Sequence, residues 1–278
     1  MTIQKINPVA MLGYYIVALF FLVLFGFPFV LTTIMSFKSM NDYMGGDFWG
    51  LPKKLYFGNF DKVLRSKFNI YFLNSLIVAG FATFFTTIVA SLASYALAKI
   101  KFRFSELVLM IFVIGMMIPV HTTLIPIYQM TKSLRLTNTF PGLIIPYISF
   151  GLPVAIYIMT SFFKEVSNSI QESAVIDGAS PLRIYWSIML PISVPAVSTA
   201  AILNFLGFWN EFIMAMTMIN STSKKTLPLG LRDFYGTESI NIPSVLTAVF
   251  VGSLPVILFY VFAQEKVING LSAGAVKG

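Results

Sequence analysis

Long apolar runs alternate with short polar segments along the whole chain. About 20 apolar residues cross a bilayer, and a charge left in hydrocarbon costs several kcal/mol, so each long charge-poor run predicts a transmembrane helix. The predicted helices cover residues 11–36, 72–98, 107–129, 141–163, 191–219 and 243–263. The runs are continuous, whereas barrel strands alternate over about ten residues. We therefore expect an all-α integral membrane protein, with six transmembrane helices in a single domain over residues 1–278.

The composition supports this class and excludes several others. Hydrophobic residues make up 57% of the chain and charged residues 11%, with a mean hydropathy of +0.82. The first apolar run is too long for a signal peptide and lacks an A-x-A-like cleavage site, so we expect a retained helix. Cysteine is absent and His121 is the one histidine, which excludes thiolate and histidine-clustered metal sites. We expect neither a metal nor a cofactor.

The net charge of +8 reflects basic residues in the loops, which favours lipid headgroups and topology over nucleic acid as their partner. An even number of helices places both termini on one side. Eight of the 19 Lys and Arg residues lie at the termini and in loops 2 and 4, and 11 lie in loops 1, 3 and 5. Residues 59–68 of loop 1 predict an amphipathic helix on the membrane or on a partner. The cluster Lys99, Lys101 and Arg103 favours an inside position for loop 2, but the total charge count leaves the orientation undecided.

Loop 4, residues 164–190, is polar and punctuated by residues typical of helix ends. Ser169 followed by Glu172 has the spacing of a capping box, in which the serine caps a helix and the glutamate reaches back to it. The predicted helix covers about residues 170–177 and ends at Gly178, which can adopt the left-handed conformation.

A second short helix is predicted directly after this glycine. Ser180 is a suitable N-cap, and Pro181 suits the first helical position. This helix leads into the fifth transmembrane helix and carries one predicted apolar face, formed by Leu182, Tyr185, Trp186 and Met189. Such a rigid element either packs on its own helix bundle or docks on a soluble partner and passes force to the membrane helices. The physical pattern alone leaves both interpretations open.

The same loop resembles the EAA motif of permease subunits of binding-protein-dependent ABC importers, whose pattern is E-A-A-x3-G-x9-I-x-L-P. The resemblance has one departure, because Ser173 replaces an alanine. The resemblance implies a cytoplasmic helix-turn-helix loop that docks into a cleft of an ATPase subunit. The residues that it assigns to this coupling role are Glu172, Ser173, Ala174, Asp177, Gly178, Ile188, Leu190 and Pro191.

The resemblance extends over nearly the whole chain. It includes 74-NSLIVAGF, 95-YALAKIKF, 125-IPIYQM, 209-WNEF and the tail 270-GLSAGAVKG. These segments are similar to the carbohydrate branch, which contains the smaller maltose-type permease subunit. Membership would imply a bacterial plasma membrane protein with both termini in the cytoplasm. Its partners would be a cytoplasmic ABC ATPase dimer, a second homologous permease subunit and an extracellular solute-binding protein. The tail would contact the ATPases through Gly270, Gly274 and Lys277.

The chain contains no G-x-x-x-x-G-K-[ST] segment and no evident nucleophile–base pair, so we expect a non-catalytic subunit that relies on a partner for ATP hydrolysis. We expect the function to be translocation of a sugar, in the form of an oligosaccharide, across the plasma membrane by an ATP-driven importer. Alternatives are a permease for a polyamine, phosphate or glycerol phosphate, an ion-coupled secondary transporter that uses Glu211, and a membrane scaffold that transports nothing.

Four polar residues in the apolar segments are candidates for the translocation path: His121, Asn204, Asn210 and Glu211. Glu211 is the one acid predicted inside a transmembrane helix, on the same stripe as Asn204. It could line the sugar path, lock one access state, or pair with another helix as a structural residue. His121 lies in a stretch interrupted by prolines, where it could line a path or form an interhelical hydrogen bond.

Overall fold

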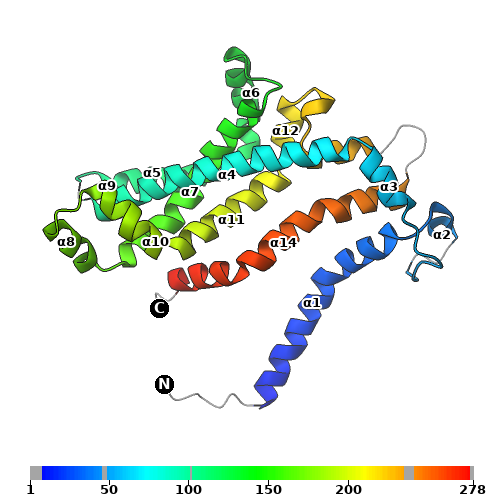
Figure 1. Ribbon diagram of the computed structural model, residues 1–278, viewed down its shortest axis with the longest axis horizontal. Coiled ribbons are helices and arrows are strands. Elements are labelled where there is room, and N and C mark those ends of the chain that lie inside the picture. The colour runs from blue at the N-terminus through cyan, green and yellow to red at the C-terminus, as the bar shows by residue number, and fades with distance from the viewer. Residues whose placement is uncertain (1–7, 46–48, 101, 235–240, 276–278) are drawn as a thin grey trace. The chain divides into compact units, whose positions relative to one another are not determined.

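The computed structural model describes residues 8–45, 49–100, 102–234 and 241–275. All regular elements in these ranges are helices (Figure 1). The chain forms two compact units, of which the first comprises Met1–Phe68 and Leu231–Leu254 and the second comprises Asn69–Gly230 and Pro255–Gly278. The expectation of an all-α membrane protein is confirmed for the described part of the chain.

The first unit contains the N-terminal helix, two short helices and the first part of the C-terminal helix. Their bounds are α1 Pro8–Ser36, α2 Met40–Met44, α3 Gly58–Arg65, η4 Leu231–Phe234 and α14 Ile242–Ala275. The second unit contains the remaining helices and the rest of α14. Their bounds are α4 Phe68–Lys99, α5 Ser105–Gly115, η1 Val120–Thr123, α6 Leu124–Ser133, α7 Phe140–Glu165, α8 Asn168–Ile176, α9 Pro181–Ile184, η2 Tyr185–Met189, α10 Leu190–Ile192, α11 Val194–Asn210, α12 Ile213–Met218, η3 Thr222–Lys224 and α13 Leu227–Gly230.

Four described helices are long and apolar enough to cross a membrane: Met11–Ser36, Phe68–Lys99, Phe140–Glu165 and Ile242–Val261. Two further pairs of helices pass the same test together but are bent at a short break. These pairs are Ser105–Gly115 with Val120–Ser133, bent by 88°, and Pro181–Ile192 with Val194–Asn210, bent by 78°. If each bent pair is one span, the described part of the chain has the six spans that the apolar pattern predicts.

The expected spans over 107–129 and 191–219 are both broken, the first in the stretch where its prolines suggested a kink and the second where no break was expected. The first is interrupted before Pro119, whose ring fixes the backbone and whose missing N–H cannot extend the preceding helix. The second begins at Val194, after a bend at Ser193, and ends at Asn210. Residues 213–218 form the separate helix α12. Hydropathy located both spans but did not resolve their breaks, because the broken stretches remain apolar.

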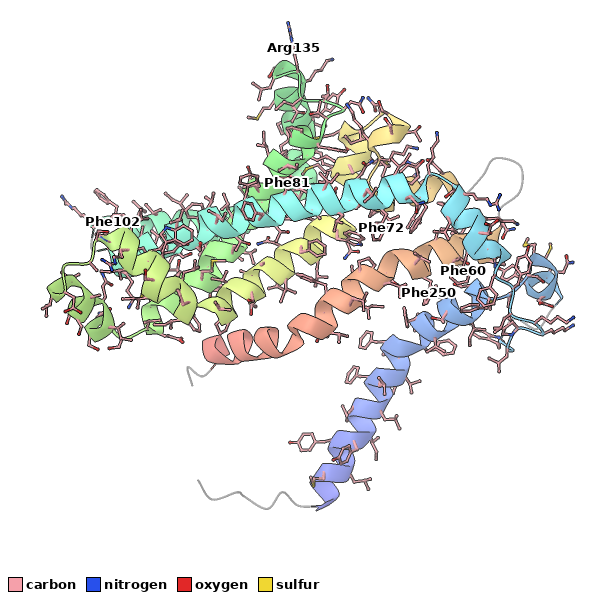
Figure 2. All side chains as sticks on the ribbon, viewed as in Figure 1. Phe60, Phe72, Phe81, Phe102, Arg135 and Phe250 are labelled. Atoms are coloured by element: carbon pink, nitrogen blue, oxygen red, sulfur yellow. The ribbon has the colours of Figure 1, made fainter. Side chains whose placement is uncertain are left out.

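The predicted amphipathic helix in loop 1 is present as α3, and it packs on its own unit. The Asn59 amide nitrogen donates to the carbonyl oxygens of Ser36 at 3.1 Å and Lys38 at 2.8 Å, at the C-terminal end of α1. The Phe60 ring lies with its centroid 6.4 Å from that of Phe250 in α14 (Figure 2). Helix α3 therefore closes the end of α1, instead of resting only on lipid or on a partner.

The second unit has a close three-helix contact at Gly151 in α7. A Cβ added at this glycine would lie 2.6 Å from Asn204 Oδ1, 2.7 Å from Phe208 Cζ and 3.1 Å from Thr86 Cγ2. Glycine therefore allows α4, α7 and α11 to approach one another, as small residues do at helix interfaces in membranes. A larger residue here would force the side chains of Asn204 and Phe208 to shift.

The loops beyond α6 and α12 are joined by the side chain of Asn138. Its backbone has a φ of +58°, and its Oδ1 atom accepts hydrogen bonds from the backbone N–H groups of Asn220 at 3.1 Å and Ser221 at 2.9 Å. The start of α4 supports the same loop, since Asn74 Nδ2 donates to the carbonyl oxygen of Lys225 at 2.9 Å. Two asparagines thus order a segment that has few backbone partners of its own.

We predict that Asn138→Ala lowers the melting temperature of the purified protein more than Asn138→Asp. Alanine leaves two backbone N–H groups without their acceptor and disfavours the positive φ, whereas aspartate keeps the acceptor and tolerates that backbone. The loss for alanine should be about 1–3 kcal/mol. Ser133→Ala is the control, because its exposed hydroxyl binds only the Met130 carbonyl of its own helix. Equal melting of the alanine variant and this control would contradict the role of Asn138.

Candidate functional site

Loop 4 forms the predicted helix, glycine turn and second helix. Helix α8 ends in a Schellman motif, in which the Ala179 N–H donates to the Ala174 carbonyl at 2.9 Å and the Gly178 N–H donates to the Val175 carbonyl at 3.0 Å. Gly178 has a φ of +76°, which confirms the prediction of a left-handed glycine. The turn is therefore set by backbone hydrogen bonds and by a conformation that glycine adopts without strain.

The predicted capping box at Ser169 and Glu172 is wrong. Helix α8 starts earlier, with Ser167 as its N-cap, and the Ser167 hydroxyl oxygen accepts a hydrogen bond from the Ser169 N–H at 3.3 Å. Ser169 Oγ lies 2.7 Å from Ser167 Oγ, so both serine side chains serve the same helix end. Residues 167–169 are all of types that favour the N-cap position, and the three-residue spacing to Glu172 pointed to Ser169 instead of Ser167.

The second helix begins as predicted, with Ser180 as N-cap and Pro181 in the first turn. The Arg183 N–H donates to Ser180 Oγ at 3.4 Å. The predicted apolar face is divided, however. Tyr185 and Met189 are buried, while Leu182 is 61% and Trp186 49% exposed. A π-helical turn over Tyr185–Met189 changes the angular spacing that a regular helix would give these residues.

The π-helical turn packs against the C-terminal half of α4. Tyr185 Oη lies 2.6 Å from Ser91 Oγ, and both atoms are buried. The ring of Tyr185 has its centroid 5.4 Å from that of Tyr95, and Tyr95 also contacts Phe163 of α7 at 6.3 Å. The second half of loop 4 is therefore anchored in the hydrophobic core of its unit. The half-buried residues Ile188 and Leu190 pack against the same core, and Pro191 is exposed.

The first half of the loop presents a mixed apolar and acidic surface. Ala174 is buried beneath α8, whereas Glu172 and Ser173 are exposed. Val175 is 56% and Ile176 85% exposed. Asp177 at the C-cap is also exposed. Large apolar side chains on a polar loop are costly in water, so this surface is suited to contact with another protein.

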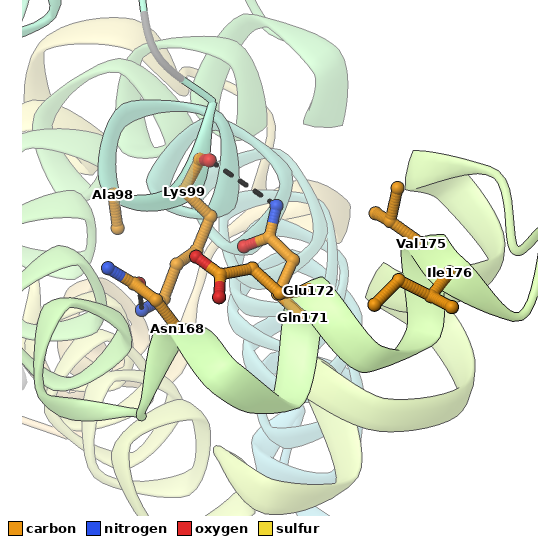
Figure 3. A pocket seen from close by; sticks show the side chains of 7 residues that line it. All are labelled: Ala98, Lys99, Asn168, Gln171, Glu172, Val175 and Ile176. Carbon is orange, nitrogen blue, oxygen red and sulfur yellow. Dashed lines mark hydrogen bonds between the residues drawn. The ribbon is translucent and has the colours of Figure 1, made fainter.

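A pocket of about 470 Å³ separates α8 from the end of α4 (Figure 3). Ala98 and Lys99 line its α4 side, and Glu172 and Ile176 are among the residues that line its α8 side. Lys99 Nζ donates to Asn168 Oδ1 at 2.8 Å at one edge. From the sequence, Lys99 was counted only as part of the basic cluster in loop 2, and Ser91 and Tyr95 had no predicted role. Their four-residue spacing on an apolar helix was the signal that could have identified them.

Glu211 lies just beyond α11 and caps α12. Its Oε1 accepts a hydrogen bond from the Met214 N–H at 2.7 Å, and its Oε2 accepts one from the Ala215 N–H at 3.1 Å. Tyr147 of α7 donates its hydroxyl to Oε2 at 2.6 Å, and its ring stacks on Phe208 at 5.3 Å. The carboxylate thus has three donors. Of the roles considered for Glu211, this arrangement agrees with a structural residue that pairs with another helix, here α7. Helix α11 ends at Asn210, so Glu211 does not lie inside a transmembrane helix as expected.

The other path candidates occupy different environments. Asn204 is buried, and its Nδ2 has no hydrogen-bond partner within the described residues. Asn210 is exposed and donates to the Leu206 carbonyl of its own helix at 2.9 Å. His121 is exposed in η1, and no contact joins it to the Glu211 cluster in the described part of the chain. Phe208 links the surroundings of Asn204 and Glu211 through its contacts with Gly151 and Tyr147.

The predicted ATPase-contacting tail lies largely beyond what the structure describes. Gly270 and Gly274 belong to the last turns of α14, for which the backbone alone is described. Lys277 lies outside the described residues. The contacts of this tail therefore stay a prediction.

The chain is similar to known transport proteins over most of its length. Residues 87–264 match the family described as the binding-protein-dependent transport system inner membrane component. An ABC transporter permease protein of Caldicellulosiruptor sp. (strain Rt8B.4) is 38% identical over 90% of this chain and 91% of the relative. The trehalose/maltose transport system permease protein of Thermococcus litoralis is 32% identical over 91% of each chain.

A solved structure shares the fold. A chain in the crystal structure of a bacterial ABC transporter involved in the import of the acidic polysaccharide alginate aligns with a TM-score of 0.82 and 22% identity. The alignment covers 95% of this chain and 99% of that chain. These similarities confirm the family that the EAA motif indicated.

We predict that Gly178→Ala accelerates amide hydrogen exchange in α8, because alanine is strained at a φ of +76° although its Cβ would meet no atom within 4 Å. Gly178→Asn should have a smaller effect, since asparagine tolerates this conformation. Gly207→Ala is a matched control in an open position within α11, without a positive φ. Exchange in α8 that is the same for the alanine variant and wild type would contradict the strain argument.

Proposed function

The chain belongs to the family of inner membrane components of binding-protein-dependent transport systems, and from this membership we propose that it is the permease subunit of an ATP-driven sugar importer. Loop 4 carries the proposal, because it combines an exposed docking surface with a rigid connection to the membrane helices. Val175 and Ile176 are exposed on α8, while Tyr185 is fixed in the core one short helix later. A force applied to α8 is thus transmitted into the helices that Tyr185 contacts.

The partner that fits loop 4 is a cytoplasmic ABC ATPase dimer. An apolar surface beside Glu172 suits a cleft with apolar walls and a basic or polar rim. Docking here places loop 4 and both termini in the cytoplasm. When ATP closes the dimer, the docked loops follow the ATPase subunits, and the attached helices shift between inward-open and outward-open arrangements. A second permease subunit and an extracellular solute-binding protein complete the importer.

We further propose that ATP hydrolysis belongs to the partner. Its sequence contains no phosphate-binding G-x-x-x-x-G-K-[ST] segment, so the proposed work is mechanical and the subunit is not itself an enzyme. The differential affinity of the ATPase dimer for ATP in its closed state supplies the bias between the two arrangements. The permease converts that bias into access for the solute from one side or the other.

A sugar is the proposed solute. The Thermococcus litoralis relative transports trehalose and maltose by name, and the structural relative takes part in alginate import. In this chain the buried Asn204 amide nitrogen, which lacks a described partner, is a suitable donor for a sugar hydroxyl when the helices separate. Glu211 is less suited to that role or to ion coupling, because Tyr147 and two backbone N–H groups already occupy its carboxylate.

We predict that Ile176→Asp and Glu172→Lys each prevent the ATPase from co-purifying with this subunit, and that both abolish sugar uptake in reconstituted vesicles. Ile176→Asp places a charge in a contact that is desolvated on docking. Glu172→Lys reverses the charge of the neighbouring carboxylate, one helical turn earlier on α8. Lys164→Ala is the control, because it alters an exposed residue of the preceding helix. Normal assembly and uptake by both variants would refute the assignment of α8 as the docking surface.

We predict that Glu211→Ala reduces thermal stability while the half-saturating sugar concentration stays unchanged. Alanine leaves the Met214 and Ala215 N–H groups and the Tyr147 hydroxyl without their charged acceptor, at a cost of about 1.5–3 kcal/mol or more. Glu211→Gln should lie between alanine and wild type, because it retains an acceptor oxygen. Asn210→Ala serves as a control for a neighbouring exposed residue. A stable Glu211→Ala protein with weakened sugar dependence would instead place Glu211 on the path.

A further inference from the structure

Lys99 is a buried cation at the C-terminal end of α4. Its residue exposure is 9%, and its Nζ atom donates to the carbonyl oxygen of Val166 and, at 2.8 Å, to Asn168 Oδ1. Val166 is the C-cap of α7, and its carbonyl belongs to the group that a helix leaves without internal partners. A cation at the C-terminal end of a helix also interacts favourably with the negative end of the helix dipole. Lys99 thus joins α4 to the junction between α7 and α8.

A second hydrogen bond runs between the same elements in the opposite direction. Gln171, one turn into α8, donates its amide Nε2 to the carbonyl oxygen of Lys99 at 3.4 Å (Figure 3). That carbonyl is at the end of α4, where it has no partner in the following turn of a helix. Helix α8 therefore contacts α4 through side chains contributed by both helices, and each bond satisfies a helix-terminal carbonyl.

The contacts with α4 extend to both sides of the Gly178 turn. Ser91, Tyr95 and Lys99 are separated by four residues and lie on one face of α4. Lys99 holds the beginning of α8, while Ser91 and Tyr95 contact Tyr185 in the π-helical turn. We call Lys99, Gln171, Asn168 and the Val166 carbonyl the α4 latch.

We propose that the α4 latch transmits movement of α8 directly to α4. The docked loop then moves α4 as well as α7 and α11, to which it is connected along the chain. This inference rests on the proposed role of loop 4. Lys99 is a positioning residue in this scheme, because it acts through α8 and touches neither the solute nor ATP. The latch matters because a helix that is not adjacent to loop 4 in sequence then moves with it.

A cation that only stabilised the fold would behave differently. Its removal would lower the stability of the subunit, and any molecule that remained folded would import sugar with the normal yield per ATP. If the latch transmits movement, the folded variant should hydrolyse ATP without a proportionate gain in transport. The ratio of sugar imported to ATP hydrolysed therefore separates the two roles.

The test compares Lys99→Met with Lys99→Arg in the complete transporter, reconstituted into vesicles with its binding protein and a transported sugar. Methionine retains the length of the side chain without its donors, and arginine retains both charge and donors. We expect Lys99→Met to lower the sugar-to-ATP ratio roughly tenfold, the effect of losing one or two hydrogen bonds to a buried group, and Lys99→Arg to restore most of it. Lys164→Met is the matched control, because Lys164 is exposed on the neighbouring helix.

A wild-type ratio in an assembled Lys99→Met transporter would overturn the inference, and the proposed function would stand. A wild-type complex without ATP-dependent uptake would instead refute the proposed function. If Lys99→Met fails to assemble, the chain without cysteine allows spin labels at Ile100→Cys and Ser169→Cys in the otherwise wild-type protein. If the latch makes α4 and α8 move together, the distance between the two labels is the same in the nucleotide-free and ATP-bound states. A distance that changes between these states would overturn the inference.

Discussion

Helix ends constrain this structure most, because a helix leaves its terminal backbone groups without internal partners and a buried end has no water to satisfy them. The residues that the site depends on answer this requirement in different ways. Lys99 satisfies the last carbonyl of α7, and Glu211 satisfies the first N–H groups of α12. Asn59 does the same for carbonyls at the end of α1. Each of these side chains also joins two helices, so satisfying helix ends and fixing the helix arrangement are one task.

The broken spans follow from the same constraint. Between α5 and η1, the N–H groups of Met117 and Ile118 donate to the carbonyls of Ile114 and Gly115 at 2.9 Å and 3.3 Å. The break before Pro119 is thus tolerated because local turns replace the missing helical bonds. At the end of α11, the side chain of Glu211 replaces them instead. Breaks of this kind give a membrane helix short rigid pieces that can turn against each other without exposing backbone to lipid.

The sequence predicted most of the local features of loop 4, with the exception of its first N-cap, which is Ser167 and not Ser169. Gly178, Ser180 and Pro181 fixed the shape of loop 4 through conformations that only certain residues favour. It could not predict contacts between helices that are distant along the chain. The pairing of Tyr147 with Glu211 needs α7 and α11 side by side, and the pairing of Lys99 with Asn168 needs α4 beside α8. Hydropathy gives the number of helices in a membrane but carries no information on their neighbours.

The same distinction explains why counting Lys and Arg left the orientation undecided. The positive-inside rule treats each basic residue as a charge that faces headgroups or solvent. In this protein, Lys99 is buried between helices, and Lys224 donates to the Asn138 carbonyl at 2.7 Å. The total count of Lys and Arg therefore includes cations whose hydrogen bonds hold the fold together, so it overstates the charge that faces the headgroups.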